Sequence, residues 1–310
     1  MADALIPLQR ASRRFERIGA VGELLSAQVN LISLDLALVQ PLDALEVFER
    51  ARSKFDRIDD IDDLGVWRAH GAAALAANGR LREATALLDE VLQQKGPAPK
   101  TTVLALASTF AADVDFASGN FPAAMNHARQ ALAAMPDPPR LLDEHAKVRM
   151  TLIRSLRTLR QDPEADRELA RLLMWAEAQP KTGSGPGWYA RLAVAEQASA
   201  QGRLDVAERF FQEALKRASE QDAATGIVEV AASFGNALID AGDLTQASLV
   251  VGRVGRWAEH DYRCALLAAR LYHALGKEDA WRSALDVARG LAGEREIPPA
   301  LDQAPRTMRP

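Results

Sequence analysis

One motif recurs along the chain, and its spacing restricts the fold more than any other feature of the sequence. In its best copies a glycine is followed five positions later by a mostly small residue, nine positions later by an apolar or small residue, and twelve positions later by another. Five glycines begin such copies: Gly79, Gly119, Gly202, Gly242 and Gly276. Positions three and four residues apart share one face of an α-helix, so each copy predicts a turn followed by an amphipathic helix.

Successive copies are mostly about 40 residues apart, and only the interval from Gly242 to Gly276 is 34. Two weaker copies lack the glycine. One turns at Pro41, and the other has Asp162 as its expected N-cap and Pro163 as its first helical residue. A period of this length, with room for two helices in each copy, is typical of a helical repeat array.

The motif resembles the second helix of the tetratricopeptide repeat (TPR) family, which carries an Ala, a Phe or small residue, and an Ala at this spacing. The resemblance is most specific at Gly202, Ala207, Phe211 and Ala214. It implies an all-α fold over residues 1–293, a right-handed α-α superhelix (TPR solenoid) of about seven helical hairpins plus a leading half-repeat. Arrays with such long repeats look like those attached to bacterial regulatory proteins.

Composition supports helices and excludes several classes of protein. Apolar residues make up 48% of the chain and aromatic residues only 5%, which is poor in the residues that fill sheets. A net charge of −4 gives no overall basic field, so we expect no direct binding of nucleic acid by this segment. No apolar stretch approaches the roughly 18 residues of a membrane span, and the N-terminus lacks a signal-peptide profile. We expect no membrane association and a cytoplasmic location, or a periplasmic one if a preceding part contains a membrane span.

The opening helix carries the same motif as the copy that turns at Pro41. Its motif positions are Ala4, Leu8 and Ala11, which lie 40 residues before Ala44, Phe48 and Ala51. The chain is therefore expected to begin inside a repeat, at its second helix, and to be cut from a longer protein. The alternative is an N-terminal cap, which repeat arrays need for solubility.

Two segments interrupt the pattern. The Gly- and Pro-containing stretch 179–187 predicts a flexible joint between the first four hairpins and the last three. The Pro-rich tail 294–310 is expected to be disordered.

No constellation of residues predicts catalysis, a metal or a cofactor. Asp60, Asp62 and Gly65 partly match an EF-hand loop, but Gly71 stands where the bidentate Glu should be, so the acidic run is interpreted as a loop that caps the next helix. The five histidines show no metal-ligand spacing. The single cysteine, Cys264, excludes an intramolecular disulfide and is interpreted as a packed thiol, with a reactive thiol as the alternative. We therefore expect a protein that is not an enzyme.

The resemblance also implies where a partner would bind. In TPR arrays the first helix of each hairpin lines a concave groove, and inward positions recur near its second, fifth, ninth and twelfth residues. On this sequence they select Asn30, Ser33, His70, Thr109, Asp113, Phe116, Lys147, Arg154, Arg157, Tyr189, Glu196, Asn236, Asp240, Arg263, Arg270 and His273.

The fourth hairpin adds a prediction about the charge of the partner. Lys147, Arg154 and Arg157 lie at i, i+7 and i+10, which places them on one face of a helix. Such a basic patch would hold a carboxylate or an acidic peptide. The alternative is an ordinary solvated helix face. The Lys and Asn pattern of the family's carboxylate clamp is not reproduced.

Three functional hypotheses follow. The leading one is a non-enzymatic module that binds a peptide or protein segment, as the sensing or regulatory part of a larger bacterial regulator of transcription or signalling. The second is a small-molecule-sensing domain. The third is a scaffold or oligomerisation module, which would form a homodimer through the final predicted helix, 277–291.

Overall fold

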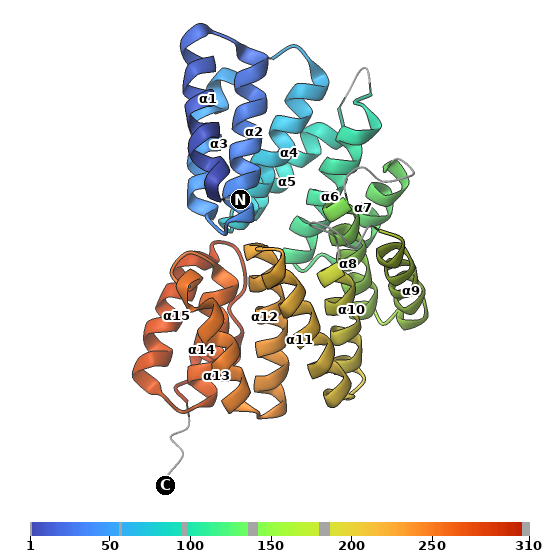
Figure 1. Cartoon of the computed structure of the whole chain (residues 1–310), viewed down its shortest axis with the longest axis vertical. Helices are drawn as coiled ribbons and strands as arrows, with labels where there is room; N and C mark the ends of the chain where they lie inside the picture. Colours follow the sequence, from blue (N-terminus) through green and yellow to red (C-terminus); the bar gives the residue numbers. More distant parts are fainter. Residues whose placement is uncertain (1, 56–57, 95–97, 136–141, 180–186, 306–310) are drawn as a thin grey trace. The chain divides into compact units, whose positions relative to one another are not determined.

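The computed structural model describes residues 2–55, 58–94, 98–135, 142–179 and 187–305. Every regular element in this part of the chain is a helix, and no strand occurs in it (Figure 1). Its α-helices are α1 (Leu5–Ile18), α2 (Val21–Ala37), α3 (Pro41–Phe55), α4 (Ile61–Ala77), α5 (Leu81–Leu92), α6 (Thr101–Ala117), α7 (Phe121–Ala134), α8 (Leu142–Thr158), α9 (Asp162–Ala178), α10 (Gly187–Ala200), α11 (Leu204–Glu220), α12 (Ala224–Ala241), α13 (Leu244–Val254), α14 (Tyr262–Ala274) and α15 (Glu278–Ala292). The predicted all-α fold is confirmed.

The chain divides into two compact units, Met1–Pro186 and Gly187–Pro310. The first unit holds α1 and the hairpins α2–α3, α4–α5, α6–α7 and α8–α9, and the second holds α10–α11, α12–α13 and α14–α15. A leading half-repeat and seven hairpins are thus present, as the motif predicts. The boundary between the units falls at the end of the expected joint 179–187. Because residues 180–186 lie outside the described part, the flexibility of that joint remains a prediction.

The helices of each unit form two layers. The first helices of successive hairpins contact one another, α2 with α4, α4 with α6 and α6 with α8, and in the second unit α12 contacts both α10 and α14. Within its unit, a second helix also contacts the first helix of the next hairpin, as α3 does with α4 and α11 with α12. Helix α1 packs against α2 in the same way, so it has the position of a second helix.

The motif residues of the second helices fill the space between the layers. In α11, Ala207, Phe211 and Ala214 are each 3% exposed or less. Small residues let paired helices approach closely. The first and second hairpins also approach closely at Gly71 of α4, where an added Cβ would come within 2.1 Å of the Phe48 ring of α3.

The turns inside the hairpins contain a left-handed residue even where the glycine is missing. Gly79 has a φ of 75°, and Val39 and Arg160 adopt φ values of 60° and 59° in the two weaker copies. In all three cases the second helix begins two residues later. This geometry places Gln161 at the N-cap of α9, so the prediction of Asp162 as the N-cap is wrong by one residue.

The acidic run is a capping loop, as its interpretation from the sequence required. The Asp60 carboxylate accepts the backbone N–H groups of Asp62 and Asp63 at 2.9 Å and so caps α4. The carboxylate of Asp62 accepts the N–H of Lys100 at 2.7 Å, which ties the start of α4 to the start of α6.

The segment after α15 folds back onto the last hairpin. Leu301 is 4% exposed and packs with Trp281 and Leu285 of α15. The Asp302 carboxylate pairs with the Arg289 guanidinium at 2.8 Å.

The prediction that the tail 294–310 is disordered is therefore wrong for residues 294–305, because apolar side chains of this segment pack against α15. Residues 306–310 lie outside the described part. The packing also bears on the homodimer hypothesis, which assumed that the final helix has no partner after it. Part of that helix is covered by the chain's own Ile297 and Leu301.

Candidate functional site

Three consecutive first helices of the first unit bring together aromatic and polar side chains. The His70 ring of α4 contacts the Phe110 ring of α6 edge-on, with centroids 5.6 Å apart. The Lys147 ammonium of α8 lies 5.5 Å from the Phe110 centroid and pairs with the Asp113 carboxylate at 2.6 Å. The Thr151 hydroxyl donates to Asp113 at 2.8 Å. These five residues form the candidate site, which we call the α4–α6–α8 face.

The charges on this face differ from the predicted basic patch. Lys147 is paired with Asp113, and Arg154 and Arg157 are half-buried and are not free of partners. The three cations on α8 are therefore not a row of solvated charges, because the neighbouring first helix supplies a carboxylate to the first of them. The face is instead mixed, with an aromatic centre and both hydrogen-bond donors and acceptors.

His70 contributes to this face as a neutral ring near neutral pH. Its Nδ1 atom lies 2.9 Å from the Val66 carbonyl oxygen. Burial against Phe110 and its surroundings lowers the pKa of His70, although the bond to Val66 opposes the change.

The other predicted groove residues of the first unit are scattered. Asn30 and Ser33 are exposed on α2, and the Ser33 hydroxyl donates to the Val29 carbonyl at 3.0 Å. Phe116 is half-buried and packs edge-on against Phe121, with centroids 5.3 Å apart.

Thr109 does not line a groove, contrary to its prediction. It is 0% exposed, and its hydroxyl donates to the Ala105 carbonyl at 2.8 Å. The reason is the position of α6 between α4 and α8, which closes the side of the helix on which Thr109 lies.

In the second unit a separate cluster forms around Arg270 of α14. Its guanidinium donates to the Asn236 side-chain oxygen at 2.6 Å and to the Asp240 carboxylate at 2.7 Å, so three predicted residues meet there. Arg263, about two turns earlier in the same helix, donates to Glu229 at 2.8 Å and to Asp261 at 2.8 Å.

The remaining predicted residues of this unit have other neighbours. The Glu196 carboxylate accepts the Ser233 hydroxyl at 2.9 Å. Tyr189 stacks on Trp188 with centroids 3.6 Å apart. His273 Nε2 lies 3.1 Å from the Gln303 carbonyl oxygen, in the segment that folds back after α15.

The sequence analysis missed several partners in these clusters, among them Phe110, Thr151, Glu229 and Ser233. The sequence separation between bonded residues is a signal that could have found them. Asp113 and Thr151 are 38 residues apart, Glu196 and Ser233 are 37 apart, and Asn236 and Arg270 are 34 apart. Each separation is one repeat, so polar residues one period apart on first helices are the pairs to look for.

The described residues contain no group of three or more His, Cys, Asp or Glu side chains that could hold a metal ion. Cys264 is 2% exposed, and burial raises the pKa of its thiol, so it is a packed thiol as interpreted. Among the helices of the described part, none has the length and apolar character that crossing a membrane requires.

Comparisons with known proteins add evidence on the fold. No family model matches the chain, and no curated protein matches it. Among solved structures, a Rap protein complexed with competence and sporulation factor is similar, with a TM-score of 0.67 at 14% identity over 94% of this chain and 87% of that one. A tetratricopeptide repeat protein from Parabacteroides merdae ATCC 43184 has a TM-score of 0.52 at 14% identity over 90% of this chain and 97% of that one.

The fold is that of a TPR-type helical repeat. The apo form of RapI is a further TPR-type match, with a TM-score of 0.58 at 11% identity over 86% of this chain and 98% of that one. The α4–α6–α8 face thus lies on consecutive first helices of a TPR array.

Proposed function

We propose that this protein is a non-enzymatic binding module that takes a peptide or protein segment on the α4–α6–α8 face. The observation that carries the proposal is the half-buried Phe110 ring, flanked by the Lys147 ammonium and the Asp113 carboxylate. An apolar side chain of a peptide can pack on such a ring. The carbonyl and N–H groups of the peptide backbone can bond to the donor Lys147 and the acceptor Asp113 beside it.

The likeness to solved TPR-type structures supports the same class of function. The similar Rap protein was solved in complex with competence and sporulation factor, so a fold of this kind can carry a binding partner. We extend this to the role of a sensing or regulatory part in a bacterial regulator. An acidic segment would have to displace Asp113 from Lys147, so the arrangement favours a segment with an apolar side chain and mixed polarity.

The test is selection from a phage-displayed library of random peptides against the full chain. We expect an enriched set of related sequences that bind wild type. Phe110→Ala should weaken their binding by about thirtyfold, the effect of losing an aromatic hot spot, and Lys147→Glu by about tenfold.

The matched control is Lys216→Glu, which makes the same charge reversal at an exposed position of α11. It should bind like wild type. Thermal melts followed by circular dichroism establish that each variant is folded. If no peptides are enriched, or if they bind folded Phe110→Ala and Lys147→Glu as they bind wild type, the proposal is wrong.

A further inference from the structure

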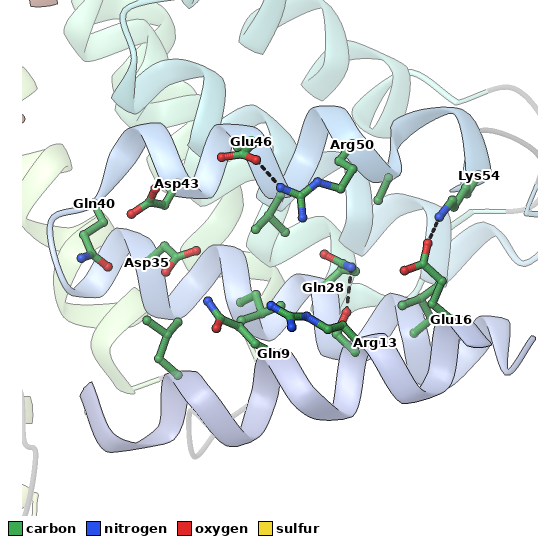
Figure 2. A pocket seen from close by; sticks show the side chains of 16 residues that line it. Gln9, Arg13, Glu16, Gln28, Asp35, Gln40, Asp43, Glu46, Arg50 and Lys54 are labelled. Carbon is green, nitrogen blue, oxygen red and sulfur yellow. Dashed lines mark hydrogen bonds and ion pairs between the residues drawn. The ribbon is translucent and has the colours of Figure 1, made fainter. Parts of the chain in front are cut away.

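A polar cavity of about 260 Å³ lies in the first unit between α1 and α3, with α2 as its floor (Figure 2). It shares no residue with the α4–α6–α8 face. Helix α1 forms one wall and α3 the other, because second helices in successive repeats are separated by the first helix between them.

Asp35 of α2 lines this cavity and is only 3% exposed. No hydrogen bond to its carboxylate comes from any described residue. Buried polar groups in proteins almost always have a partner, and a buried carboxylate without one is costly. A hydrogen-bond donor for the Asp35 carboxylate would therefore have to lie in the cavity.

A second carboxylate stands beside Asp35. Figure 2 shows Asp43 of α3 at the same end of the cavity, with Gln40 next to it and Gln9 reaching up from α1. Burial and the Asp43 charge raise the pKa of Asp35 to about 6. Near neutral pH this end of the cavity holds two carboxylates and no cation between them.

The cations of the cavity are placed differently. On α3, Arg50 pairs with Glu46, and Lys54 pairs with Glu16 of α1. Arg13 of α1 lines the cavity and pairs with no acidic side chain among the described residues. The charged groups that line the cavity around Asp35 are Arg13 and Glu16 on α1 and Asp43, Glu46, Arg50 and Lys54 on α3.

We propose that this cavity binds a small organic cation, with its ammonium or guanidinium group between Asp35 and Asp43. Charge-assisted bonds from such a group would give the Asp35 carboxylate the donors that it lacks. Arg13 lines the same cavity and would pair with a carboxylate on the same ligand, so the ligand class that we propose is a basic amino acid.

The experiment is isothermal titration of the full chain with three probes: L-arginine, its decarboxylated form agmatine, and L-citrulline, whose side-chain urea is an uncharged isostere of the guanidinium. We expect L-arginine to bind, agmatine to bind more weakly, and L-citrulline to bind more than about tenfold more weakly than L-arginine, because the side chain of L-citrulline brings no charge to Asp35. Affinity for L-arginine should fall from about pH 8 to about pH 5, where Asp35 becomes protonated.

Asp35→Asn should weaken L-arginine binding by more than about tenfold. The matched control, Glu23→Gln, makes the same carboxylate-to-amide change at an exposed position of α2 outside the cavity and should bind like wild type. Asp35→Asn removes a buried charge, so its melting temperature should not be lower than that of wild type at about pH 8. If Asp35→Asn nevertheless fails to fold, the Asp43→Asn variant, at an exposed position, replaces it in the test. We expect Asp43→Asn to weaken L-arginine binding as well.

Three results would overturn the cation site: no binding of L-arginine or agmatine up to the order of 10 mM, wild-type affinity in Asp35→Asn, or equal affinity for L-citrulline. Equal affinity for agmatine and L-arginine would overturn the role of Arg13.

Discussion

At the scale of single residues, two of the hairpin turns hold a non-glycine residue in the left-handed backbone conformation, which costs free energy of folding. Arg160 and Val39 have the left-handed conformation that glycine has elsewhere, with φ values of 59° and 60°. An L-residue with a side chain pays roughly 1–2 kcal/mol in this conformation, whereas glycine pays almost none. Arg160 is exposed, so its turn is the simpler one to test.

Arg160→Gly should raise the free energy of unfolding by about 0.5–1 kcal/mol, because relief of the strain exceeds the extra chain entropy of glycine in the unfolded state. Urea unfolding at an unchanged m-value measures this. The reciprocal variant is Gly202→Ala, at a φ of 71° with no atom within 4 Å of an added Cβ. It should lose about 1 kcal/mol through the backbone alone. A less stable Arg160→Gly would show that the Arg160 side chain makes a larger contribution than its backbone costs.

Residue chemistry also explains what the sequence could and could not predict. The turn glycines and the small motif residues predict the hairpins because their steric roles depend only on local spacing. Thr109 and Asp35 show the limit. Whether each is buried depends on which helices flank α6 and α2, and this comes from the packing of neighbouring repeats.

At the scale of elements, the α8–α9 hairpin is held by a buried ion pair. The Glu168 carboxylate of α9 pairs with Arg149 of α8, and their side chains are only 7% and 14% exposed. Next to it the His145 ring packs on Trp175, with centroids 4.2 Å apart. Burial and the Arg149 charge lower the pKa of His145 to about 4, so the ring is neutral at neutral pH.

Glu168→Leu should lower the free energy of unfolding by roughly 3 kcal/mol or more, because Arg149 would remain buried without its carboxylate. Thermal and urea unfolding measure the loss. The control, Glu46→Leu, breaks the ion pair with Arg50, where both side chains are more than 60% exposed, and should cost less than about 1 kcal/mol.

Replacing both partners, as Arg149→Met with Glu168→Leu, should recover most of the stability. A single variant as stable as wild type would mean that the Arg149 charge reaches solvent when its partner is lost.

At the scale of the whole molecule, each of the two units has a core of its own. In the second unit Phe211 stacks on Phe234 with centroids 4.9 Å apart, and the α14–α15 hairpin is closed by Leu301. Repeat arrays are stabilised by contacts between neighbouring repeats, so a block of three hairpins can be stable without the rest.

A fragment of residues 187–310 should therefore fold alone, with a circular dichroism spectrum dominated by helix and a cooperative thermal melt. The matched fragment 187–293 lacks Leu301 and should melt about 5–10 °C lower, because Trp281 and Leu285 lose an apolar contact worth roughly 2 kcal/mol. An unstructured 187–310 fragment would show that the second unit depends on the first. Equal melting of the two fragments would show that the returning segment adds no stability.

The side-chain pairs that join consecutive repeats have a consequence for how such a chain can change length. Asp113 bonds Thr151 and Asn236 bonds Arg270, each across one period of the sequence. Duplication or loss of a whole period keeps the remaining first helices in the same register, so the positions that form these junctions still face one another. Insertion of one residue inside a first helix instead turns the residues after it by about 100° relative to those before it, which removes them from the shared face. A change of length in whole periods thus preserves the register on which such junctions depend.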